Sequence, residues 1–537
     1  MKNFFPKSKL EWLKFFGLVL IALSILIAFF TRIFLNFFNF QFSHVDAIRD
    51  SFVVERMKNG DFPGYGPVTS RSGVFHLPLY YYILFIFSFL GSNPVFQSFP
   101  NALFSFFSVS LFGVLIFKIL NKENFEKKIF LTGFAMFWWS VFFSDIALSN
   151  RNWNPNSIPF FLILFFLIFE QIFFVTKVWQ KIFLWSLFGL VLSILVSLHS
   201  TTMFTMPIVF AICIFIFLFR GFKRKENFLK NLIFPSLSVV ISIISLIPYF
   251  ILEFKRGFEN TREILGLILH GGYANISFIE KLDNISRVIL SLSRVEYFVN
   301  EYNFNFFGIF IVAIISIFIL NIKPNKTFWI SILSTFFLYL FASSNWVQEF
   351  HRHYKLEIVF MPIIFFVFII SEMDFKKFGN IFISIFLIIG AFFSIKYNIQ
   401  KDVNYIKNLY GKDRIMVVSD YVEVLKFLPD KSLICSTVNG IGTFDYLNKT
   451  IVKKDFRFYP ICEKGDYFVY KKIVADEYFY NFQKNPNSKP ENFKVIFENE
   501  VYIIFQNEGG QKGFWDLQDA EYTKEDTWNL SKPSKFF

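Results

Sequence analysis

The sequence predicts an all-α polytopic membrane protein with a small α/β domain at its C-terminus, and three observations lead to this fold class. The chain of 537 residues is 54% hydrophobic and only 18% charged, whereas soluble proteins carry about 25% charged residues. The apolar residues fall in long unbroken runs, each near the ~20 residues that cross a bilayer as a helix. From about residue 401 these runs give way to a more charged segment.

About eleven runs are long enough to span a membrane. The first starts after Lys14 and is too long for a signal peptide, and no small-residue cleavage site follows it. A further run, 78–90, lies between Pro78 and Gly91 and is too short for a comfortable crossing. The predicted spans are 12–31, 99–118, 129–148, 156–176, 182–199, 203–220, 232–252, 304–322, 327–343, 355–372 and 378–397.

The distribution of basic residues predicts the orientation. If 78–90 does not cross, Lys and Arg gather in the leader and in alternate loops, while the short loops on the other side hold only Arg151 and Arg352. The positive-inside rule then places the N-terminus in the cytoplasm and the C-terminal domain outside the cell (plasma) membrane. The run 78–90 becomes an interfacial or re-entrant helix of the first outer segment, 32–98, and a second long outer segment covers 253–303.

Composition divides the chain into three parts. Residues 1–400 form the transmembrane domain, 401–507 an extracytoplasmic α/β domain, and 508–537 a polar tail that is expected to be poorly ordered.

The α/β domain contains two cysteines, Cys435 and Cys462, which could pair if the domain lies outside the cell. Short apolar runs predict strands, and the segment between the first two predicts a helix. The predicted strands are 415–418, 432–435, 467–470 and 501–505, and the predicted helix is 421–428.

The net charge of +13 does not indicate a nucleic-acid partner, because the basic residues lie between the apolar runs and form no continuous stripe. The polar residues that could carry chemistry lie in the first outer segment. Asp46 and Asp50 are four residues apart and share one face of a helix. Such a pair can act as a general base or hold a divalent cation, and it can equally solvate an interfacial helix.

The histidines leave a second metal hypothesis open. His76, His351 and His353 all map to the outer side, together with His44. Interfacial hydrogen bonding is the more common role of such residues, and a metal site is the alternative.

The motifs of the first outer segment resemble those of the glycosyltransferase family C fold, and most closely its family 39 branch. Gly60-Asp61-Phe62-Pro63-Gly64-Tyr65-Gly66-Pro67 is followed by His76-Leu77-Pro78-Leu79-Tyr80-Tyr81-Tyr82. The asparagine-rich stretch from Asp145 to Asn156, at the outer end of a predicted span, and the stretch 349–355 before Pro362 also fit this resemblance. The chain departs from the family in having Ala47 where a second acidic residue is common, and in one residue of the His76 motif.

The resemblance implies a transferase that takes a hexosyl or pentosyl group from a polyprenyl-phosphate-linked sugar. The acceptor, which could be a glycan, a lipid or a protein, would be met at the outer membrane face. It implies that Asp46 is the catalytic base of an inverting displacement, with no certain cofactor and a divalent cation as an option. Arginine suits the phosphate, because its fork matches phosphate oxygens. The expected substrate-binding residues are Asp50, Arg71, His76, Tyr80, Arg151, Asn154, His351, Arg352 and His353.

Two other functions fit a chain of this kind. A transporter or flippase for a lipid-linked sugar would also have many spans, and would carry charged or broken segments at mid-membrane. A structural protein without chemistry is the second alternative, although the long first outer segment with its Gly and Pro residues favours a functional loop.

Overall fold

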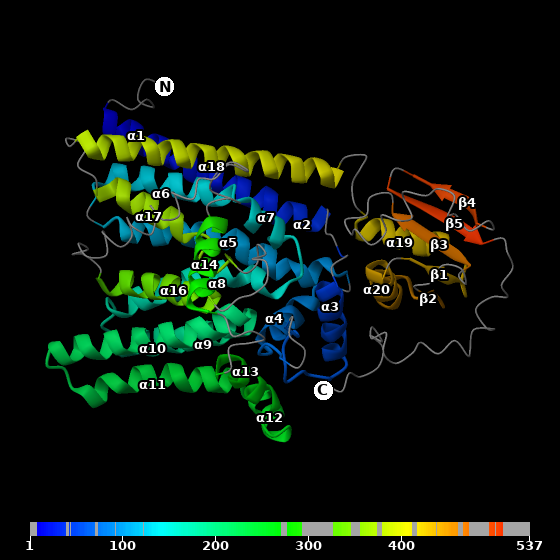
Figure 1. The fold of residues 1–537 in the computed structure, drawn as a ribbon, viewed down its shortest axis with the longest axis horizontal. Helices are drawn as coiled ribbons and strands as arrows, with labels where there is room; N and C mark the ends of the chain where they lie inside the picture. The colour runs from blue at the N-terminus through cyan, green and yellow to red at the C-terminus, as the bar shows by residue number, and fades with distance from the viewer. Residues whose placement is uncertain are drawn as a thin grey trace.

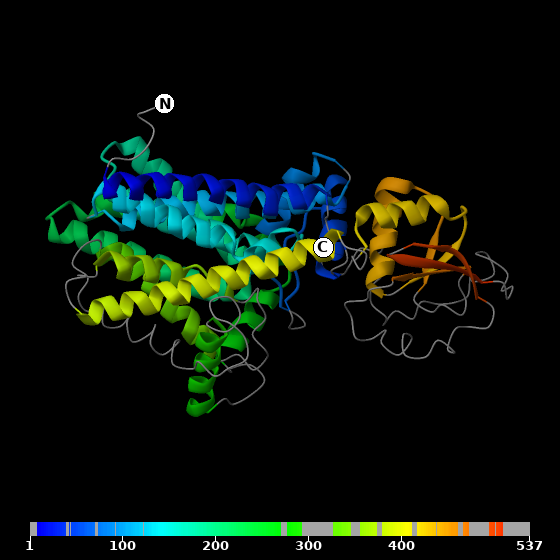
Figure 2. The ribbon, with the colours of Figure 1, turned by 90° about the horizontal axis from the view of Figure 1, so that it is seen from above.

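The computed structural model shows a bundle of long helices with a small mixed domain at one end (Figure 1). Figure 2 shows the same arrangement from above, with the sheet and its helices beyond the ends of α1 and α18. The fold class predicted from the sequence is therefore confirmed. The structure describes residues 8–38, 42, 45–69, 74–91, 93–121, 123–269, 277–292, 326–344, 355–372, 378–410, 416–436, 438–459, 466–471, 493–499 and 501–507.

Helices occupy every predicted span except 304–322, which lies outside the described residues. By length and apolar composition, five helices of the described chain can cross a membrane, or seven if each of two bent pairs forms one span. The chain is thus a multi-pass membrane protein. The unbent bundle helices are α1 (Lys9–Ala28), α5 (Val95–Ile119), α8 (Ile158–Ile172), α9 (Val178–Leu198), α10 (Ser200–Lys223), α16 (Lys326–Ser344), α17 (Met361–Glu372) and α18 (Phe378–Tyr410).

Two predicted spans are bent. The run expected at 129–148 divides into α6 (Phe125–Ser140) and α7 (Phe143–Ser149), which meet at 54°. The run expected at 232–252 divides into α11 (Phe228–Ser245) and α12 (Ile247–Lys255), which meet at 59°. Pro248 explains the second break, because proline cannot supply the N–H that would continue α11 into α12.

Small residues let the first span pack closely. α1 and α6 make the most extensive helix–helix contact of the bundle. Gly17 lies so close to α6 that a Cβ there would stand 2.7 Å from the backbone of Phe130, and Gly133 faces the carbonyl of Gly17 in return. Such small-residue contacts are typical of helix packing inside a membrane, where close van der Waals contact replaces the hydrophobic effect.

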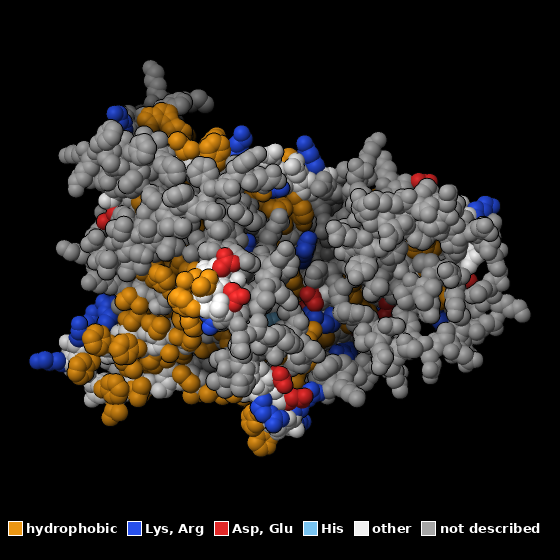
Figure 3. Space-filling model, in the orientation of Figure 1, with side chains coloured by type: hydrophobic (Ala, Val, Ile, Leu, Met, Phe, Trp, Pro, Cys, Tyr) orange, Lys and Arg blue, Asp and Glu red, His pale blue; other side chains and the backbone are white. Residues whose placement is uncertain are grey.

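The surface of the bundle is apolar where lipid would cover it. In Figure 3 hydrophobic side chains gather over α10 and α11, at the lower left. Phe215, Phe222, Ile233 and Ile244 are among the exposed hydrophobic residues on these two helices. In water such a patch would drive association, whereas in a bilayer it is the surface that the acyl chains solvate.

The first outer segment folds into short helices that pack onto the end of the bundle. It contains α3 (Val45–Lys58) and α4 (Leu79–Ser88). In the connection between them, Val68 and Phe75 form an isolated antiparallel β-bridge. With 10 residues, α4 is only about 15 Å long, so it is too short to cross, as the sequence predicted for 78–90. Asn260 clamps this segment, because its side-chain amide accepts from the backbone N–H of Phe75 and donates to its carbonyl.

The second outer segment also carries helices. α13 (Glu259–Leu269) follows α12 after a short turn, and α14 (Phe278–Leu292) packs against α16. The side-chain amide of Asn284 on α14 donates to the carbonyl of Ser344, 2.9 Å away, at the end of α16. Both long outer segments are therefore folded against the bundle where they are described.

The C-terminal domain combines a five-stranded sheet with two helices and a short π-helix. The strand order is β2-β1-β3-β5-β4, with β1 parallel to β2 and β3, and β5 antiparallel to β3 and β4. The strands are β1 (Leu433–Cys435), β2 (Arg457–Tyr459), β3 (Tyr467–Lys471), β4 (Phe493–Glu498) and β5 (Tyr502–Asn507). The helical elements are α19 (Val418–Phe427), α20 (Val438–Leu447) and η5 (Asn448–Val452).

One predicted strand is wrong and two observed strands were not predicted. The apolar run 415–418 ends in the first residue of α19, because the Asp420 carboxylate accepts from the backbone N–H of Val417 and caps the helix. Strands β2 and β4 escaped the sequence analysis because Arg, Lys and Glu interrupt their apolar pattern. The other three predicted strands correspond to β1, β3 and β5.

The expected division at residue 400 falls within α18, which continues from the bundle to Tyr410. The first described residue of the C-terminal domain after this helix is Met416. Cys435 is buried in β1, whereas Cys462 and the tail 508–537 lie outside the described residues.

Candidate functional site

The acidic pair of the first outer segment lies on α3, at the end of the bundle that faces the C-terminal domain (Figure 1). The sequence favours a helix here because Asp46 lies in its first turn, and Arg56 and Lys58 in its last. These charges oppose the partial charges of the helix ends. Asp46 and Asp50 are therefore on one helix at the predicted spacing.

Arg49 joins the two carboxylates. Its Nη1 donates to Oδ1 of Asp46 at 2.8 Å, and its Nε donates to Oδ1 of Asp50 at 2.9 Å. The three side chains differ in exposure: Asp46 is 32% exposed, Arg49 is 17% exposed and Asp50 is fully buried. Asp46 is thus the more accessible of the two carboxylates.

Asp50 is a buried carboxylate with one oxygen fully engaged. Its Oδ1 also accepts from the hydroxyl of Tyr81 at 2.9 Å, whereas its Oδ2 has no hydrogen-bond partner. Burial raises the pKa of Asp50 to about 6, although the charge of Arg49 acts to lower it. The structure therefore places Asp50 beneath Arg49, where it orients the guanidinium.

In the structure an arginine, Arg49, lies where the spacing of the paired acids had suggested a divalent cation as an option. Arg49 lies between them and supplies the positive charge that a metal would otherwise bring. In the described part of the chain no three His, Cys, Asp or Glu side chains come together as potential metal ligands.

A buried amide network supports the site from below. The hydroxyl of Tyr80 on α4 donates to Oδ1 of Asn152 at 2.6 Å, and Nδ2 of Asn152 donates to Ser51 on α3 at 3.2 Å. Asn101 on α5 donates to the backbone carbonyl of Arg151 at 2.9 Å. The asparagine-rich stretch therefore ties α3, α4 and α5 to one another, which gives its polar residues a structural role.

Asn154 lies deeper in the bundle than the sequence suggested. It begins the short 3-10 helix η2 (Asn154–Ser157), and its side-chain amide donates to the carbonyl of Leu198 at the end of α9. Asn154 is buried, so as placed its side chain holds two helices together.

Two histidines meet beside the acidic pair. The rings of His76 and His199 stack with their centroids 5.9 Å apart, and Nδ1 of His76 has no hydrogen-bond partner. His199 separates α9 from α10. Burial lowers the pKa of His76 to about 3, and the nearby charge of Arg49 adds to this effect. His76 is consequently neutral at physiological pH, which leaves Arg49 as the cation beside it.

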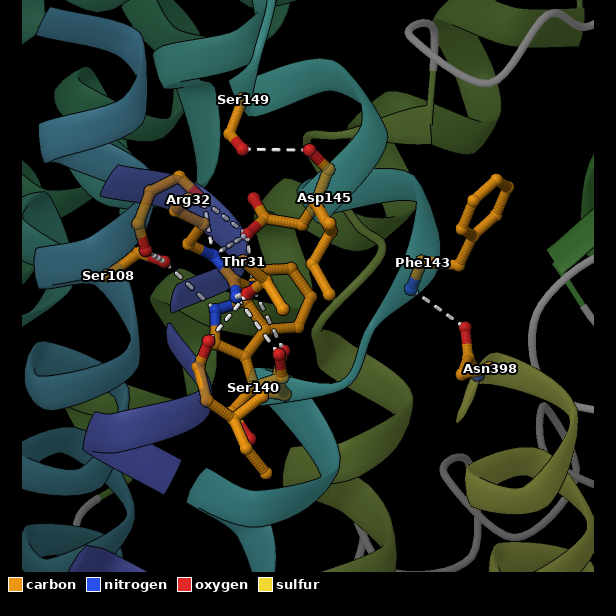
Figure 4. Close-up of polar contacts among 12 residues, drawn as sticks. Thr31, Arg32, Ser108, Ser140, Phe143, Asp145, Ser149 and Asn398 are labelled. Atoms are coloured by element: carbon orange, nitrogen blue, oxygen red, sulfur yellow. Dashed lines mark hydrogen bonds and ion pairs between the residues drawn. The ribbon is translucent and has the colours of Figure 1, made fainter. Parts of the chain in front are cut away.

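A second buried charge pair lies where α6 breaks into α7. Arg32 belongs to η1 (Phe29–Phe34), a π-helical turn that continues α1 and leads into α2 (Leu35–Phe38). Its Nη2 is 2.8 Å from Oδ2 of Asp145 on α7, and both side chains are buried. Figure 4 shows Arg32 pointing at Asp145, with the carbonyl of Ser140 also within hydrogen-bonding distance.

This pair explains the bend of the span. The guanidinium of Arg32 donates to the carbonyls of Trp139 and Ser140, which the break leaves without helical partners. On the other side of the break, Oδ1 of Asn398 accepts from the N–H of Phe143 at 2.9 Å (Figure 4). Asp145 is therefore part of a structural joint.

The structure brings together only some of the residues expected to form the site. Asp46, Asp50, His76 and Tyr80 gather around α3 and α4, whereas Asn154 lies within the bundle. Arg71, His351, Arg352 and His353 lie outside the described residues.

Three neighbours of this group were not predicted: Arg49, Tyr81 and His199. The contact of Arg49 could have been predicted from the sequence, because a cation three residues after an acid on a helix is placed to pair with it. The contacts of Tyr81 and His199 with this group could not, because they depend on how separate helices pack.

The fold is shared with known membrane glycosyltransferases. No protein-family model and no curated protein sequence matches this chain. ArnT from Cupriavidus metallidurans in the apo state matches with a TM-score of 0.51 at 10% identity, over 91% of this chain and 97% of that chain. This likeness shows that the chain has the glycosyltransferase family C fold, as the sequence motifs predicted.

Two further structures show weaker likeness. ArnT from the same organism bound to undecaprenyl phosphate matches with a TM-score of 0.48 at 9% identity, over 98% of this chain and 100% of that chain. The oligosaccharyltransferase AglB from Archaeoglobus fulgidus, in complex with an inhibitory peptide and a dolichol-phosphate, matches with a TM-score of 0.45 at 12% identity. That match covers 84% of this chain and 65% of the longer archaeal chain.

Proposed function

We propose that this protein is a membrane glycosyltransferase that moves a sugar from a polyprenyl-phosphate-linked donor to an acceptor hydroxyl. The observation that carries the proposal is the group on α3: a partly exposed Asp46, held by an Arg49 that a buried Asp50 orients. The shared fold supports it, since ArnT was solved with undecaprenyl phosphate. A lipid-phosphate donor keeps its tail in the bilayer and its sugar in water, so it needs a site at the end of a helix bundle.

The chemistry follows from Asp46 and Arg49, the two members of this group that are not fully buried. Asp46 accepts the proton of the acceptor hydroxyl as its oxygen attacks the anomeric carbon. The bond from that carbon to the phosphate oxygen breaks, and its electron pair leaves with the polyprenyl phosphate. Attack from the face opposite the leaving group inverts the anomeric centre. Arg49 stabilises the charge that builds on the phosphate, because its guanidinium matches phosphate oxygens in shape and charge.

Arg49 can bind the phosphate only if at least one of its N–H groups leaves its present carboxylate partner. Its Nη1 is bonded to Asp46, and its Nε and Nη2 both contact Asp50. A donor phosphate that draws Nη1 away would remove this hydrogen bond from the Asp46 carboxylate and so favour its protonation. Arg71, Arg151, His351, Arg352 and His353 remain proposed ligands for the rest of the donor.

The activity is tested by release of the lipid product. Purified protein in lipid nanodiscs is given a panel of polyprenyl-phosphate sugars with hexosyl and pentosyl groups, and free polyprenyl phosphate is measured. We expect release with at least one donor, and faster release when acceptor is present. Donor movement across a proteoliposome membrane with no phosphate released would support a flippase and overturn the transferase proposal.

The orientation of the chain is a separate proposal. We expect the α3 end of the bundle and the C-terminal domain to face outward, with the N-terminus in the cytoplasm, because of the charge bias of the loops. The side chain of Asp61, in the first outer segment, is 41% exposed, and that of Arg224, on the opposite side in this topology, is 61% exposed. In a background with Cys462→Ser, a membrane-impermeant maleimide should label Asp61→Cys in intact cells and Arg224→Cys only after lysis.

The reverse pattern would invert the topology and place the acidic pair at the cytoplasmic face. The native Cys213 and Cys435 are buried and should give little background labelling in the folded protein.

A further inference from the structure

The helix that carries the proposed catalytic group lies between two domains. α3 packs against α4 on the bundle side and against α20 of the C-terminal domain on the other. Figure 1 shows α3 at the end of the bundle, next to α20. Ala47 and Ile48 of α3 are buried in the same apolar cluster as the core of the C-terminal domain. That cluster includes Val95, Tyr421, Val424, Phe444, Tyr446, Leu447 and Ile504.

Tyr446 on α20 makes polar and aromatic contacts with α3. The hydroxyl of Tyr446 accepts from Nε2 of Gln97 at 2.9 Å and donates to Oε1 of Glu55 at 3.2 Å. Its ring lies 5.1 Å from the ring of Phe52 on α3, edge to face, and 5.1 Å from the ring of Phe42 just before α3.

A second contact fixes the chain where α3 begins. The hydroxyl of Thr443 on α20 donates to the backbone carbonyl of Phe42 at 2.7 Å. Tyr446 and Thr443 are one helical turn apart, so α20 holds the start of α3 and its middle together.

These contacts fall on the side of α3 that faces away from the acidic pair. Glu55 follows Asp46 by nine positions, which at about 100° per residue places it roughly 180° around the helix. Phe52 lies on the same far side, whereas Arg49 and Asp50 lie within about 60° of Asp46. The C-terminal domain therefore contacts the face of α3 opposite the acidic pair. The face with Asp46, Arg49 and Asp50 remains available to the bundle and to substrate.

This arrangement also accounts for Ala47. Its side chain is 1% exposed in the cluster that α3 shares with the C-terminal domain. An acidic side chain there would be buried among apolar groups without a partner, which is strongly unfavourable. The position at which the family 39 resemblance leads one to expect a second acid is occupied here by a domain contact.

We propose that Tyr446 is a positioning residue: through Glu55, Gln97 and Phe52 it sets the rotation of α3, and with it the direction in which Asp46 and Arg49 face the substrate. The C-terminal domain is then a part of the catalytic unit. The expected change in kcat rests on the proposed function. The expected effect on the position of α3 rests only on the contacts of Tyr446.

The test compares two changes at Tyr446 with one matched control. Tyr446→Phe removes only the hydroxyl, and Tyr446→Leu also removes the ring. Tyr502→Phe is the control, because Tyr502 is equally buried in the same domain and its hydroxyl bonds to Glu423 on α19. A displacement of catalytic groups by about 1 Å can cost up to ~100-fold in rate. We expect Tyr446→Leu to lower kcat on the order of 10- to 100-fold, and Tyr446→Phe less.

The KM for the donor should change less than kcat in both variants, because Tyr446 contacts none of the proposed donor-site residues that the structure describes. Tyr502→Phe should keep the wild-type kcat. A loss of kcat in Tyr502→Phe as large as in Tyr446→Phe, or a rise in KM without a fall in kcat, would overturn the inference.

Hydrogen–deuterium exchange gives a readout that does not depend on activity. In Tyr446→Leu the amides of 45–58 should exchange faster, while those of β5 keep their wild-type protection and show that the domain is folded. Unchanged exchange across 45–58, or loss of protection in β5 to the same degree, contradicts the inference. A wild-type protein that releases no polyprenyl phosphate would instead contradict the proposed function, so the two failures are distinguishable.

Discussion

Replacing Asp46 by asparagine should lower turnover by roughly 10²–10⁴ while folding and donor binding persist. The change keeps the size of the side chain and one hydrogen bond to Arg49, but removes the charge and the lone pair that accepts the proton. Release of polyprenyl phosphate from a saturating donor measures the effect. Thermal unfolding and binding of the donor lipid show that the variant is intact.

The control for this experiment is an acid outside the group that Arg49 holds together. Asp50 lies on the same face of α3, but it is buried and bonded to Arg49 and Tyr81, so Asp50→Asn should disturb the site as well. Asp61→Asn is the better control, because Asp61 is an exposed acid of the same outer segment whose nearest ionic contact, Arg56, is 4.0 Å away. It should keep wild-type turnover.

Equal and modest losses in Asp46→Asn and Asp61→Asn would show that Asp46 is not the base. Near-wild-type turnover in Asp46→Asn would lead to the same conclusion. The search would then move to Asp50, which lies on the same face of α3. Glu55 is bonded to Tyr446 on the opposite face, and Asp145 pairs with Arg32 within the bundle.

Replacing Arg32 by leucine should destabilise the protein by about 3–5 kcal/mol, because removing one partner leaves a buried charge uncompensated. The Asp145 carboxylate would lose the guanidinium 2.8 Å away, and the carbonyls of Trp139 and Ser140 would lose their donors. Thermal unfolding in nanodiscs, followed by circular dichroism, measures the loss as a lower Tm.

The double variant Arg32→Leu/Asp145→Leu separates the charge effect from simple loss of packing. Removing both partners of a buried pair is often near neutral, so the double variant should recover much of the stability lost in the single one. Arg224→Leu is the control, because Arg224 is exposed and forms a long surface ion pair, 3.9 Å, with Glu226. Such surface pairs contribute about 0–1 kcal/mol. A Tm for Arg32→Leu equal to that of Arg224→Leu would contradict the structural role.

The sequence by itself determined the class of the protein and the positions of the apolar helices that the structure describes. Apolar runs of helical span length can satisfy their backbone groups in lipid only as helices, so composition alone predicts the bundle. It also determined that 78–90 is a short helix, since Pro78 and Gly91 bound it. The motifs of the first outer segment predicted the glycosyltransferase family C fold, and the spacing of Asp46 and Asp50 predicted a shared helical face.

Local pattern was insufficient where partners are distant in sequence. The spacing of Asp46 and Asp50 made them look equivalent, yet one is partly exposed and the other buried. That difference arises because Tyr81 and the bundle cover Asp50, and no periodicity within α3 records what packs over it. Arg49 is the exception, because a partner three residues away on the same helix is a local feature.

The tertiary structure alone decided which polar residues are structural. Asp145, Asn152 and Asn154 read as outer polar groups in the sequence, but each is bonded to another helix inside the bundle. Tyr446 meets Glu55 across 391 positions of chain, a contact that only the docking of the C-terminal domain creates. A sequence specifies a helix through neighbours a few residues apart, whereas burial depends on surfaces that meet only after the helices have packed.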